Sequence, residues 1–373
     1  MMQSTVKSLK VTYNDVRENG TFTNGDTLNG QVILEVTKDC KVESLYVKFK
    51  AKAEVMWSER HYKHTYTYYD KKKYFSLKHY FIRDGNETDG NQLLNENGKT
   101  YSDLLPPGSH VFPFTFQVPL QEIPSSFSGS VGEIVYQLET KLCRSMRFRT
   151  KETLKIPFVA TVAPDTLAQL MMTPQQDFKD KNMHVFSSGA VAMDVKIEKS
   201  GVFQGEALQI SGSIQNNSSR DITPKYCIYS KHSFFARGKR KLDTKDLLKE
   251  VGEPIPPSAS VTINKVITVP PYVKPSILNC EIIKLEYRLR VYLDVKYSSD
   301  PEVKFPITIL PGFQASAMAA NMPSTSTGFE FASHGYQNPP AFDTFSTPQP
   351  FNPPPSYGGH GMYPSLMDFG SKQ

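Results

Sequence analysis

The stretch IKLEYRLRVYLDVKY (283–297) decides the fold class of this chain. Its odd-numbered positions are all apolar or aromatic, whereas its even-numbered positions, apart from Tyr292, are charged. Successive side chains of a β-strand point to opposite faces, so this alternation predicts a strand with one face in a core. The pattern recurs at 45–57, 112–118 and 134–142, with turn signals between the runs. The sequence therefore predicts an all-β protein built from β-sandwiches.

An internal repeat indicates that there are two such sandwiches. Three stretches in the first half have counterparts, in the same order, in the second half: NGTFTNGDTLNGQV (19–32) with SGVFQGEALQISGSI (200–214), PPGSHVFPFTFQVP (106–119) with PPSASVTINKVITVP (256–270), and Pro124-Ser125 before Tyr136 with Pro275-Ser276 before Tyr287. Ordered echoes of this kind are typical of a duplicated domain. The first copy is longer because of RHYKHTYTYYDKKKYFSLKHYF (60–81), which we interpret as an extra or extended hairpin.

Composition divides the chain further. We expect a first sandwich at 1–165, an interdomain linker at 166–183, a second sandwich at 184–312 and a disordered tail at 313–373. One or two helical turns are expected near Thr166–Met172, after Pro164. The last 63 residues contain ten prolines and four charged residues. Such a segment buries too little apolar surface to offset the entropy of ordering it.

Positive charge gathers in the two predicted sandwiches. The chain has a net charge of +6, and residues 311–373, with one lysine and three acids, contribute −2, which leaves +8 for the rest. The candidates for contact with acidic cargo or lipid are Arg147, Arg149, Arg237, Lys239 and Arg240. The alternative is that these side chains form ordinary solvated loops and strand faces. Nucleic acid is not expected as a partner, because no recognition helix or zinc-finger spacing accompanies the charge.

No motif for catalysis or for a cofactor stands out. His61 and His64 lie three residues apart, and on one strand such positions face opposite sides, so unless the segment is a loop they cannot share a metal ion and we expect no metal site there. Gly98-Lys99-Thr100 resembles the end of a P-loop, but the first glycine of that motif is missing and Pro106-Pro107 rules out the helix that should follow. We therefore expect no enzyme and no cofactor.

The cysteines and the absence of targeting segments favour a cytoplasmic protein. Cys40, Cys143, Cys227 and Cys280 are widely spaced and form no CxxC pair, as expected of reduced thiols. The N-terminus has no apolar segment typical of a signal peptide, and no run of 18 uncharged apolar residues suggests a membrane span.

Several stretches resemble the α-arrestins, the arrestin domain-containing proteins, over roughly residues 5–312. They are GDTLNGQVILEV (25–36), LPPGSHVFPFTFQVP (105–119), PSSFSGSVGEIVYQLETKL (124–142), GVFQGEALQISGSIQNNSSRDITPKYCIYSKHSFFARGKRK (201–241) and KPSILNCEIIKLEYRLRVYLDV (274–295). The resemblance implies two tandem arrestin-type, immunoglobulin-like sandwiches. It also implies a trafficking adaptor that binds membrane receptors or transporters as cargo and promotes their ubiquitination, endocytosis and endosomal sorting. Such an adaptor is cytoplasmic and is recruited to the plasma membrane and endosomes.

The tail carries the motif through which that family recruits HECT-type ubiquitin ligases. Pro354-Pro355-Ser356-Tyr357 matches PPxY. Successive prolines favour the polyproline II conformation that WW domains bind in an aromatic-lined groove. A second candidate, Pro339-Pro340-Ala341-Phe342, has phenylalanine in place of tyrosine. Because the hydroxyl is lost, we expect this degenerate second motif to bind weakly.

A third tail motif and two other functions remain open. Tyr363-Pro364-Ser365-Leu366 fits signals that clathrin adaptors and ESCRT-associated adaptors read, although such short patterns also arise by chance. One alternative function is a structural trafficking subunit, like the arrestin-like component of retromer, which would not need PPxY. The other is redox-linked binding of thioredoxin through a cysteine, for which Cys280 is a candidate, although we expect it to be buried. The cargo, the ligase and the oligomeric state cannot be read from the sequence.

Overall fold

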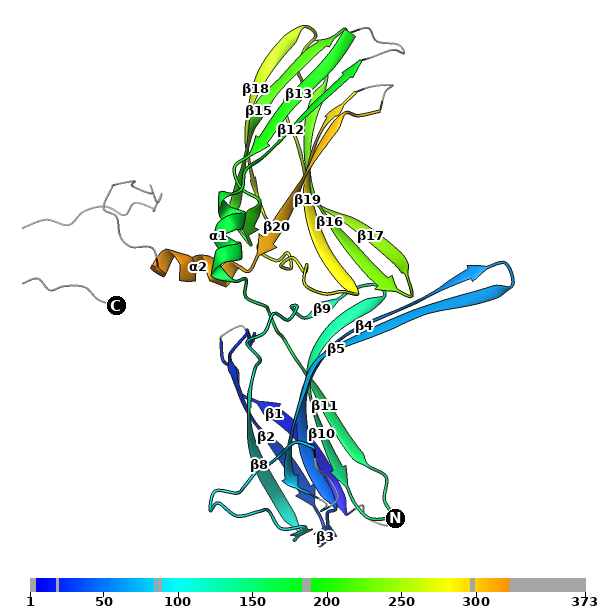
Figure 1. Cartoon of the computed structure of the whole chain (residues 1–373), viewed down its shortest axis with the longest axis vertical. Coiled ribbons are helices and arrows are strands. Elements are labelled where there is room, and N and C mark those ends of the chain that lie inside the picture. Colours follow the sequence, from blue (N-terminus) through cyan, green and yellow to red (C-terminus); the bar gives the residue numbers. More distant parts are fainter. Residues whose placement is uncertain are drawn as a thin grey trace, which may run out of the picture. The chain divides into compact units, whose positions relative to one another are not determined.

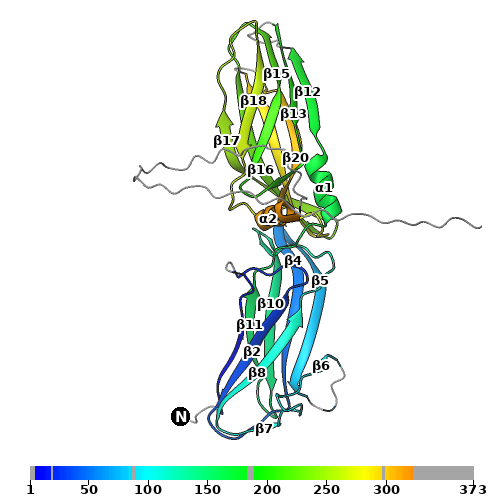
Figure 2. The ribbon, with the colours of Figure 1, turned by 90° about the vertical axis from the view of Figure 1, so that its left-hand side faces the viewer.

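A computed structural model describes residues 5–17, 20–83, 85, 89–182, 189–295 and 299–321. Its first part is a β-sandwich (Figure 1, Figure 2). One sheet has the order β1 (Val6–Tyr13), β2 (Thr27–Val36), β8 (Gly108–Gln117). The other has the order β11 (Thr150–Ile156), β10 (Gly132–Cys143), β4 (Ser44–His61), β5 (His64–Ile82), β6 (Asn91–Gln92), and β9 (Phe127–Ser128) pairs with β10. A short pair, β3 (Cys40–Lys41) with β7 (Leu104–Leu105), lies beside them.

The second part repeats this architecture, which confirms the predicted fold class. Its first sheet has the order β12 (Gln175–Asn182), β13 (Gly189–Ile197), β15 (Ala207–Ser218), β18 (Ala259–Thr268). Its second sheet has the order β14 (Gly201–Phe203), β20 (Glu302–Leu310), β19 (Ile283–Asp294), β16 (Thr223–Ala236), β17 (Lys239–Val251). All pairings are antiparallel except those of β14 with β20 and of β5 with β6.

The period-two pattern of the sequence is the burial pattern of the strands. Along β19, every odd position from Ile283 to Leu293 is buried and every even position is half-buried. Phe112, Phe114 and Phe116 of β8 are buried in the same way. Each such side chain contributes about 1.5–3 kcal/mol by leaving water, so these stripes hold the sheets together.

The Pro-Ser and Tyr echoes lie beside similar hydrogen bonds in the two sandwiches, although the bonded residues are shifted by one position between the copies. The Tyr136 hydroxyl donates to the Pro124 carbonyl at 2.6 Å, and the Tyr287 hydroxyl donates to the Lys274 carbonyl at 2.6 Å. The serine two residues after each of these carbonyls accepts a backbone N–H: Ser126 accepts from Phe158 at 3.2 Å, and Ser276 accepts from Ile309 at 2.9 Å. Ser125, the serine of the first echo, accepts instead from the Ala160 N–H at 2.9 Å. The repeat therefore preserves a set of bonds that fixes a loop to the end of a strand.

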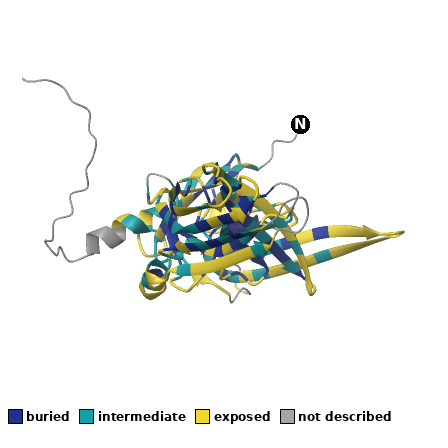
Figure 3. Ribbon diagram, turned by 90° about the horizontal axis from the view of Figure 1, so that it is seen from above, coloured by how far each residue is buried: buried dark blue, intermediate teal, exposed yellow. Residues whose placement is uncertain are grey.

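The tyrosine- and histidine-rich segment forms an extension of an existing hairpin. β4 and β5 pair from Leu45 with Ile82 out to His61 with His64, around a turn at Tyr62. The inner half of β4 alternates between buried and half-buried residues, whereas its last residues are exposed. Figure 3 shows this exposed outer half as two long yellow strands. An extended hairpin was one of the two forms that the sequence predicts.

Two segments differ from the predicted domain boundaries. The region assigned to a linker, 166–183, contains most of helix α1 (Pro164–Met172) and the whole of β12, which pairs with β13. β12 is an edge strand with no fully buried side chain, so it carries no alternating pattern that would reveal it. The helical turns expected near Thr166–Met172 are present as α1.

The start of the predicted tail is also ordered. Helix α2 (Gly312–Asn321) continues directly from the second sandwich. Its sequence GFQASAMAAN is rich in alanine, the best helix former. The proline and charge content of the whole tail, from which disorder was predicted, does not reveal this short alanine-rich segment. The Gln314 side chain accepts from the Val162 N–H and donates to the Val162 carbonyl, both at 3.1 Å. Residues from 322 onward lie outside the described residues.

Candidate functional site

The basic residues proposed to contact acidic partners lie in two separate places. Arg147 and Arg149 lie in the loop between β10 and β11 of the first sandwich. Arg237, Lys239 and Arg240 lie at the turn of the β16–β17 hairpin in the second sandwich. The end of β10 nearer to that hairpin is Gly132, since Ser130 bonds to Asp243 of β17. Because β10 runs over roughly 36 Å from Gly132 to Cys143, the two clusters lie toward opposite ends of this strand.

The β16–β17 turn presents its cations at the tip of a tight hairpin. Arg237 and Gly238 both have positive φ, 50° and 72°, as a two-residue hairpin turn requires. Arg237 and Lys239 are exposed. Arg240 is bound to the fold, since its guanidinium donates to the buried Ser233 hydroxyl at 2.7 Å and lies over the Phe235 ring. Arg237 and Lys239 are therefore better placed than Arg240 to contact a partner.

The β10–β11 loop combines its arginines with exposed apolar side chains. Arg147 and Arg149 are both exposed. Between and before them, Phe148 is 97% exposed and Met146 is 101% exposed. The charge pattern of the sequence indicates the two arginines of this loop. It does not indicate the two apolar residues, because only the fold shows that their side chains are exposed.

A cluster of lysines around a buried carboxylate was not anticipated from the sequence. Glu139 of β10 is 3% exposed, and its carboxylate accepts from Lys50 at 2.7 Å, Lys151 at 3.0 Å and Lys141 at 3.4 Å. Burial alone would raise the pKa of Glu139, but the hydrogen bonds from Lys50 and Lys151 outweigh it and lower the pKa to about 2. The lysines come from three strands, so no local motif announces this arrangement.

This cluster continues into a lysine-rich sheet face. Burial and the neighbouring charge of Lys78 lower the pKa of Lys48. Lys78 in turn bonds to Asp89 at 2.8 Å and lies over the ring of Tyr46. These lysines are thus balanced by carboxylates and an aromatic ring of the first sandwich itself, and they are not among the five basic residues proposed to contact acidic partners.

The tip of the β4–β5 hairpin brings His61 and His64 together across a turn, which is the loop case that the strand argument leaves open. His61 and His64 are cross-strand partners on either side of the turn, so they do not lie on one strand. Glu59 lies 3.6 Å from His61. Nowhere in the described ranges do three or more His, Cys, Asp or Glu side chains form a group suited to a metal ion. Tyr62, which is 98% exposed, caps the turn.

The cysteines differ in exposure. Cys40, Cys227 and Cys280 are buried and Cys143, at the end of β10, is half-buried; all four are free thiols. Burial, together with the charge of Asp246, raises the pKa of Cys227. Cys280 precedes β19 rather than starting it. The expectation that the Cys280 thiol is buried is confirmed.

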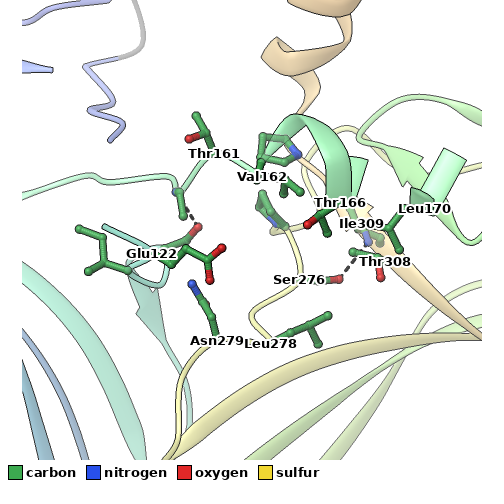
Figure 4. Close-up of a pocket in the computed structure, with 16 residues that line it drawn as sticks. Glu122, Thr161, Val162, Thr166, Leu170, Ser276, Leu278, Asn279, Thr308 and Ile309 are labelled. Atoms are coloured by element: carbon green, nitrogen blue, oxygen red, sulfur yellow. Dashed lines mark hydrogen bonds between the residues drawn. The ribbon is translucent and has the colours of Figure 1, made fainter. Parts of the chain in front are cut away.

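One cavity of about 170 Å³ lies where the linker meets both copies of the repeat (Figure 4). Its lining includes Ser125 and Ser276, the serines of the two echoes, together with Val162, Leu170 and Ile309. The lining is mainly apolar, both serines already accept backbone hydrogen bonds, and Glu122 is the one carboxylate in it.

The motifs of the tail lie outside the described residues. These are Pro354-Pro355-Ser356-Tyr357, the degenerate Pro339, Pro340 and Phe342, and Tyr363, Pro364 and Leu366. Within the part of the chain that the structure describes, neither helix has the length and hydrophobicity to cross a bilayer.

The chain has two tandem β-sandwiches, and charged and aromatic side chains are exposed on their loops. This arrangement is typical of proteins that bind other molecules. Comparison with known families places it more closely. Residues 9–162 match the arrestin (or S-antigen) N-terminal domain, and residues 187–311 match the arrestin C-terminal domain. The chain therefore belongs to the arrestin family, and within it to the α-arrestins, an assignment that the following relatives support.

Among curated proteins, human arrestin domain-containing protein 4 is 30% identical over 308 residues, which cover 82% of this chain and 71% of that protein. Its mouse counterpart is 29% identical, over 82% of this chain and 72% of that protein. Human thioredoxin-interacting protein is 24% identical, over 88% of this chain and 80% of that protein. These likenesses confirm the resemblance seen in the sequence and support an adaptor-type protein.

Proposed function

We propose that this α-arrestin is a trafficking adaptor that links membrane cargo to ubiquitin ligases. Its arrestin domains would bind receptors or transporters, and its tail would recruit WW-domain HECT ligases. The cargo would then be ubiquitinated, internalised and sorted through endosomes. We accordingly propose a cytoplasmic protein that is recruited to the plasma membrane and endosomes. The observation that carries the proposal is Pro354-Pro355-Ser356-Tyr357, which follows two arrestin domains in the same chain.

The chemistry of this motif suits a WW domain. Consecutive prolines restrict the backbone to polyproline II, so little conformational entropy is lost on binding. The Tyr357 ring would fill one pocket of the groove and its hydroxyl would donate a hydrogen bond. Pro339-Pro340-Ala341-Phe342 retains the ring but lacks that donor, which is worth about 1 kcal/mol. This second motif would therefore add little to the capture of tandem WW domains.

The test is binding of the full chain to a tandem WW module of a HECT ligase. Tyr357→Ala should weaken binding by about tenfold or more, because ring burial and a hydrogen bond are lost together. Tyr336→Ala, which removes a tail tyrosine outside any PPxY motif, is the matched control and should bind like the parent. Phe342→Tyr should strengthen binding by restoring a second motif. Equal binding of the parent and Tyr357→Ala would exclude the proposed docking site.

A redox-linked role is the second candidate, motivated by the name of one relative, thioredoxin-interacting protein. Capture of thioredoxin by a mixed disulfide needs an accessible thiolate. Cys40, Cys227 and Cys280 are buried, and burial raises the pKa of Cys227, so Cys143 is the cysteine best placed for it. Titration of the native chain with a thiol reagent should label Cys143 first, and Cys143→Ser should abolish that fast phase. A fast phase that survives Cys143→Ser would point to one of the buried thiols instead.

A retromer-like structural subunit would share the two sandwiches without requiring WW binding. The WW-domain measurement separates the two roles, since a structural subunit would be indifferent to Tyr357→Ala.

A further inference from the structure

We propose that the β10–β11 loop, residues 144–149, inserts shallowly into anionic membranes. In this arrangement Met146 and Phe148 enter the boundary between headgroups and acyl chains, while Arg147 and Arg149 bind the lipid phosphates. The inference goes beyond charge attraction, because it assigns the anchoring to two apolar side chains. It is also independent of ligase recruitment, which the tail would perform.

The exposure of these two side chains is the first observation. Met146 is 101% exposed and Phe148 is 97% exposed, in the loop of a hairpin whose first strand, β10, is largely buried and whose second strand, β11, is mostly exposed. Leu142, four residues before Met146, is fully buried, so the core of the sandwich ends before the loop begins. Removing Met146 and Phe148 from the protein surface would thus cost the fold nothing. A large aromatic and a methionine kept in water gain free energy when an apolar phase takes them up.

Charge is the second observation. The twelve residues TKLCRSMRFRTK (140–151) contain five basic side chains and no acid. Near the base of the loop, the Glu139 carboxylate is already surrounded by Lys50, Lys141 and Lys151. Two exposed acids also lie there: Glu43, whose N–H bonds to the Cys143 carbonyl, and Glu152 of β11. Arg147 and Arg149 are exposed on either side of Phe148. Each basic residue near an anionic leaflet adds to binding, and a guanidinium can hold a phosphate with two hydrogen bonds.

The combination favours a lipid surface over a protein partner. Stable peripheral binding needs two signals, an inserted apolar group and a basic patch, and this loop supplies both within four residues, Met146 to Arg149. A specific protein interface buries about 800 Å² on each side, which the convex turn of one hairpin does not offer by itself. β11 is also the edge strand of its sheet, so the hairpin is open on one side. A fluid bilayer needs no complementary pocket to accept such a tip.

The backbone of the loop is suited to hold this display. Met146 has a positive φ of 50°, and the Arg147 N–H bonds to the Arg144 carbonyl at 3.4 Å. The left-handed residue reverses the chain, so that consecutive side chains diverge from the turn instead of returning to the sheet. Polar substitution of Met146 and Phe148 should therefore leave the thermal unfolding of the chain unchanged.

The experiment is flotation of the full chain with vesicles of phosphatidylcholine containing about 30% phosphatidylserine, an anionic lipid content that gives a clearly negative surface. Met146→Ser/Phe148→Ser should reduce the bound fraction by about tenfold or more, because both apolar anchors are lost. Met172→Ser/Tyr272→Ser is the matched control, since these residues are 80% and 78% exposed elsewhere on the chain. It should bind like the parent. Arg147→Gln/Arg149→Gln should weaken binding, and vesicles of pure phosphatidylcholine should bind poorly.

A spectroscopic readout separates insertion from surface attraction. The only tryptophan of the chain, Trp57, is 4% exposed, so Phe148→Trp adds a reporter against a constant background. On vesicles, its emission should shift to the blue and be quenched by brominated acyl chains, while Tyr272→Trp should do neither. Equal vesicle binding by the parent and Met146→Ser/Phe148→Ser, or an unquenched Phe148→Trp, would overturn the proposal. Absence of vesicle binding by the parent, with a loop-dependent protein partner found instead, would overturn it as well.

Discussion

The Glu139 carboxylate lies 2.7 Å from the Lys50 ammonium, and two further lysines, Lys141 and Lys151, complete its surroundings. This buried anion is the point where strands β4, β10 and β11 of the first sandwich are joined by charge as well as by backbone hydrogen bonds. Because Glu139 is 3% exposed and the lysines are partly hydrated, the interaction is neither a surface ion pair nor a fully dry one.

The first prediction concerns acid stability. The pKa of Glu139 falls from 4.5 to about 2 in the folded chain, so its contribution to stability is complete above the unfolded pKa and is lost as pH falls toward 2. The shift corresponds to about 3 kcal/mol at most, of which water around the lysines leaves about 1–2 kcal/mol. Glu139→Gln should lower the free energy of unfolding at pH 7 by that amount and flatten its pH dependence below pH 5. Urea unfolding across pH measures both.

Glu133→Gln is the matched control, because Glu133 lies on the same strand and pairs with the exposed Lys155 at 3.2 Å. Exposed pairs contribute about 0–1 kcal/mol, so this variant should unfold nearly as the parent does. A Glu139→Gln protein with unchanged pH dependence would show that the lysines do not hold the carboxylate as described.

The second prediction concerns the hydrogen bonds shared by the two sandwiches. Tyr136→Phe leaves the buried Pro124 carbonyl without its donor, and we expect a loss of about 1–2 kcal/mol. Tyr287→Phe should cost less, about 0.5–1.5 kcal/mol, because Lys274 is exposed and water can replace the hydroxyl. The two sites belong to different sandwiches, so the losses should add in the double variant. Tyr292→Phe, on the outward face of β19, is the control; strong non-additivity would contradict independent roles.

The fold could be predicted for those strands that have one face buried in the core and the other facing outward. β19 and β8 are evident from the sequence because alternate side chains are buried. The Pro-Ser and Tyr echoes indicate the duplication, and the tyrosine of each echo donates a hydrogen bond to a carbonyl 12 or 13 residues earlier. β12 was missed because an edge strand without buried side chains carries no such pattern. α2 was not predicted because the tail was assigned by its proline and charge content, and the alanines of α2 occupy only its first few residues.

The candidate site was less predictable, since its parts meet only in three dimensions. In the sequence, Glu139 is one polar residue of an alternating strand. The residues around it in the chain do not indicate that Lys50 and Lys151 from the neighbouring strands contact it. In the sequence, Phe148 is an ordinary apolar residue between two arginines, and only the folded loop shows that its side chain is exposed. For His61 and His64, the position of the turn decides whether residues three apart share a face, and the sequence leaves strand and loop open.

The third prediction concerns the tip of the β16–β17 hairpin as a contact for acidic cargo tails. Arg237→Glu/Lys239→Glu should weaken binding of an acidic or phosphorylated peptide, and the loss should shrink as salt rises, since the Debye length is about 8 Å at physiological ionic strength. Arg240 is left intact because it bonds to Ser233. Lys179→Glu/Lys196→Glu reverses the same charge on exposed positions of β12 and β13 and should have little effect. Binding that ignores both salt and the hairpin substitutions would argue against this site.

The fourth prediction concerns Tyr363-Pro364-Ser365-Leu366 in the tail. Clathrin adaptors and ESCRT-associated adaptors each need an aromatic ring and an apolar side chain on an extended peptide, which this sequence offers. Binding of the full chain to either adaptor should be lost in Leu366→Ala and kept in Met367→Ala, which shortens the neighbouring apolar side chain. If both variants bind as the parent does, the motif is an ordinary part of the tail.

The position of this motif also predicts competition. Only five residues separate Tyr357 from Tyr363. The two tyrosines are six positions apart, so even a fully extended chain holds them only about 20–22 Å apart, less than the width of a folded domain seated on each tyrosine. A WW module added in excess should therefore displace the adaptor from the parent chain. It should not displace the adaptor from Tyr357→Ala, because that variant lacks the WW site but retains the second motif. Simultaneous binding of both partners to the parent, detected as a ternary complex by analytical ultracentrifugation, would show that the two motifs act independently.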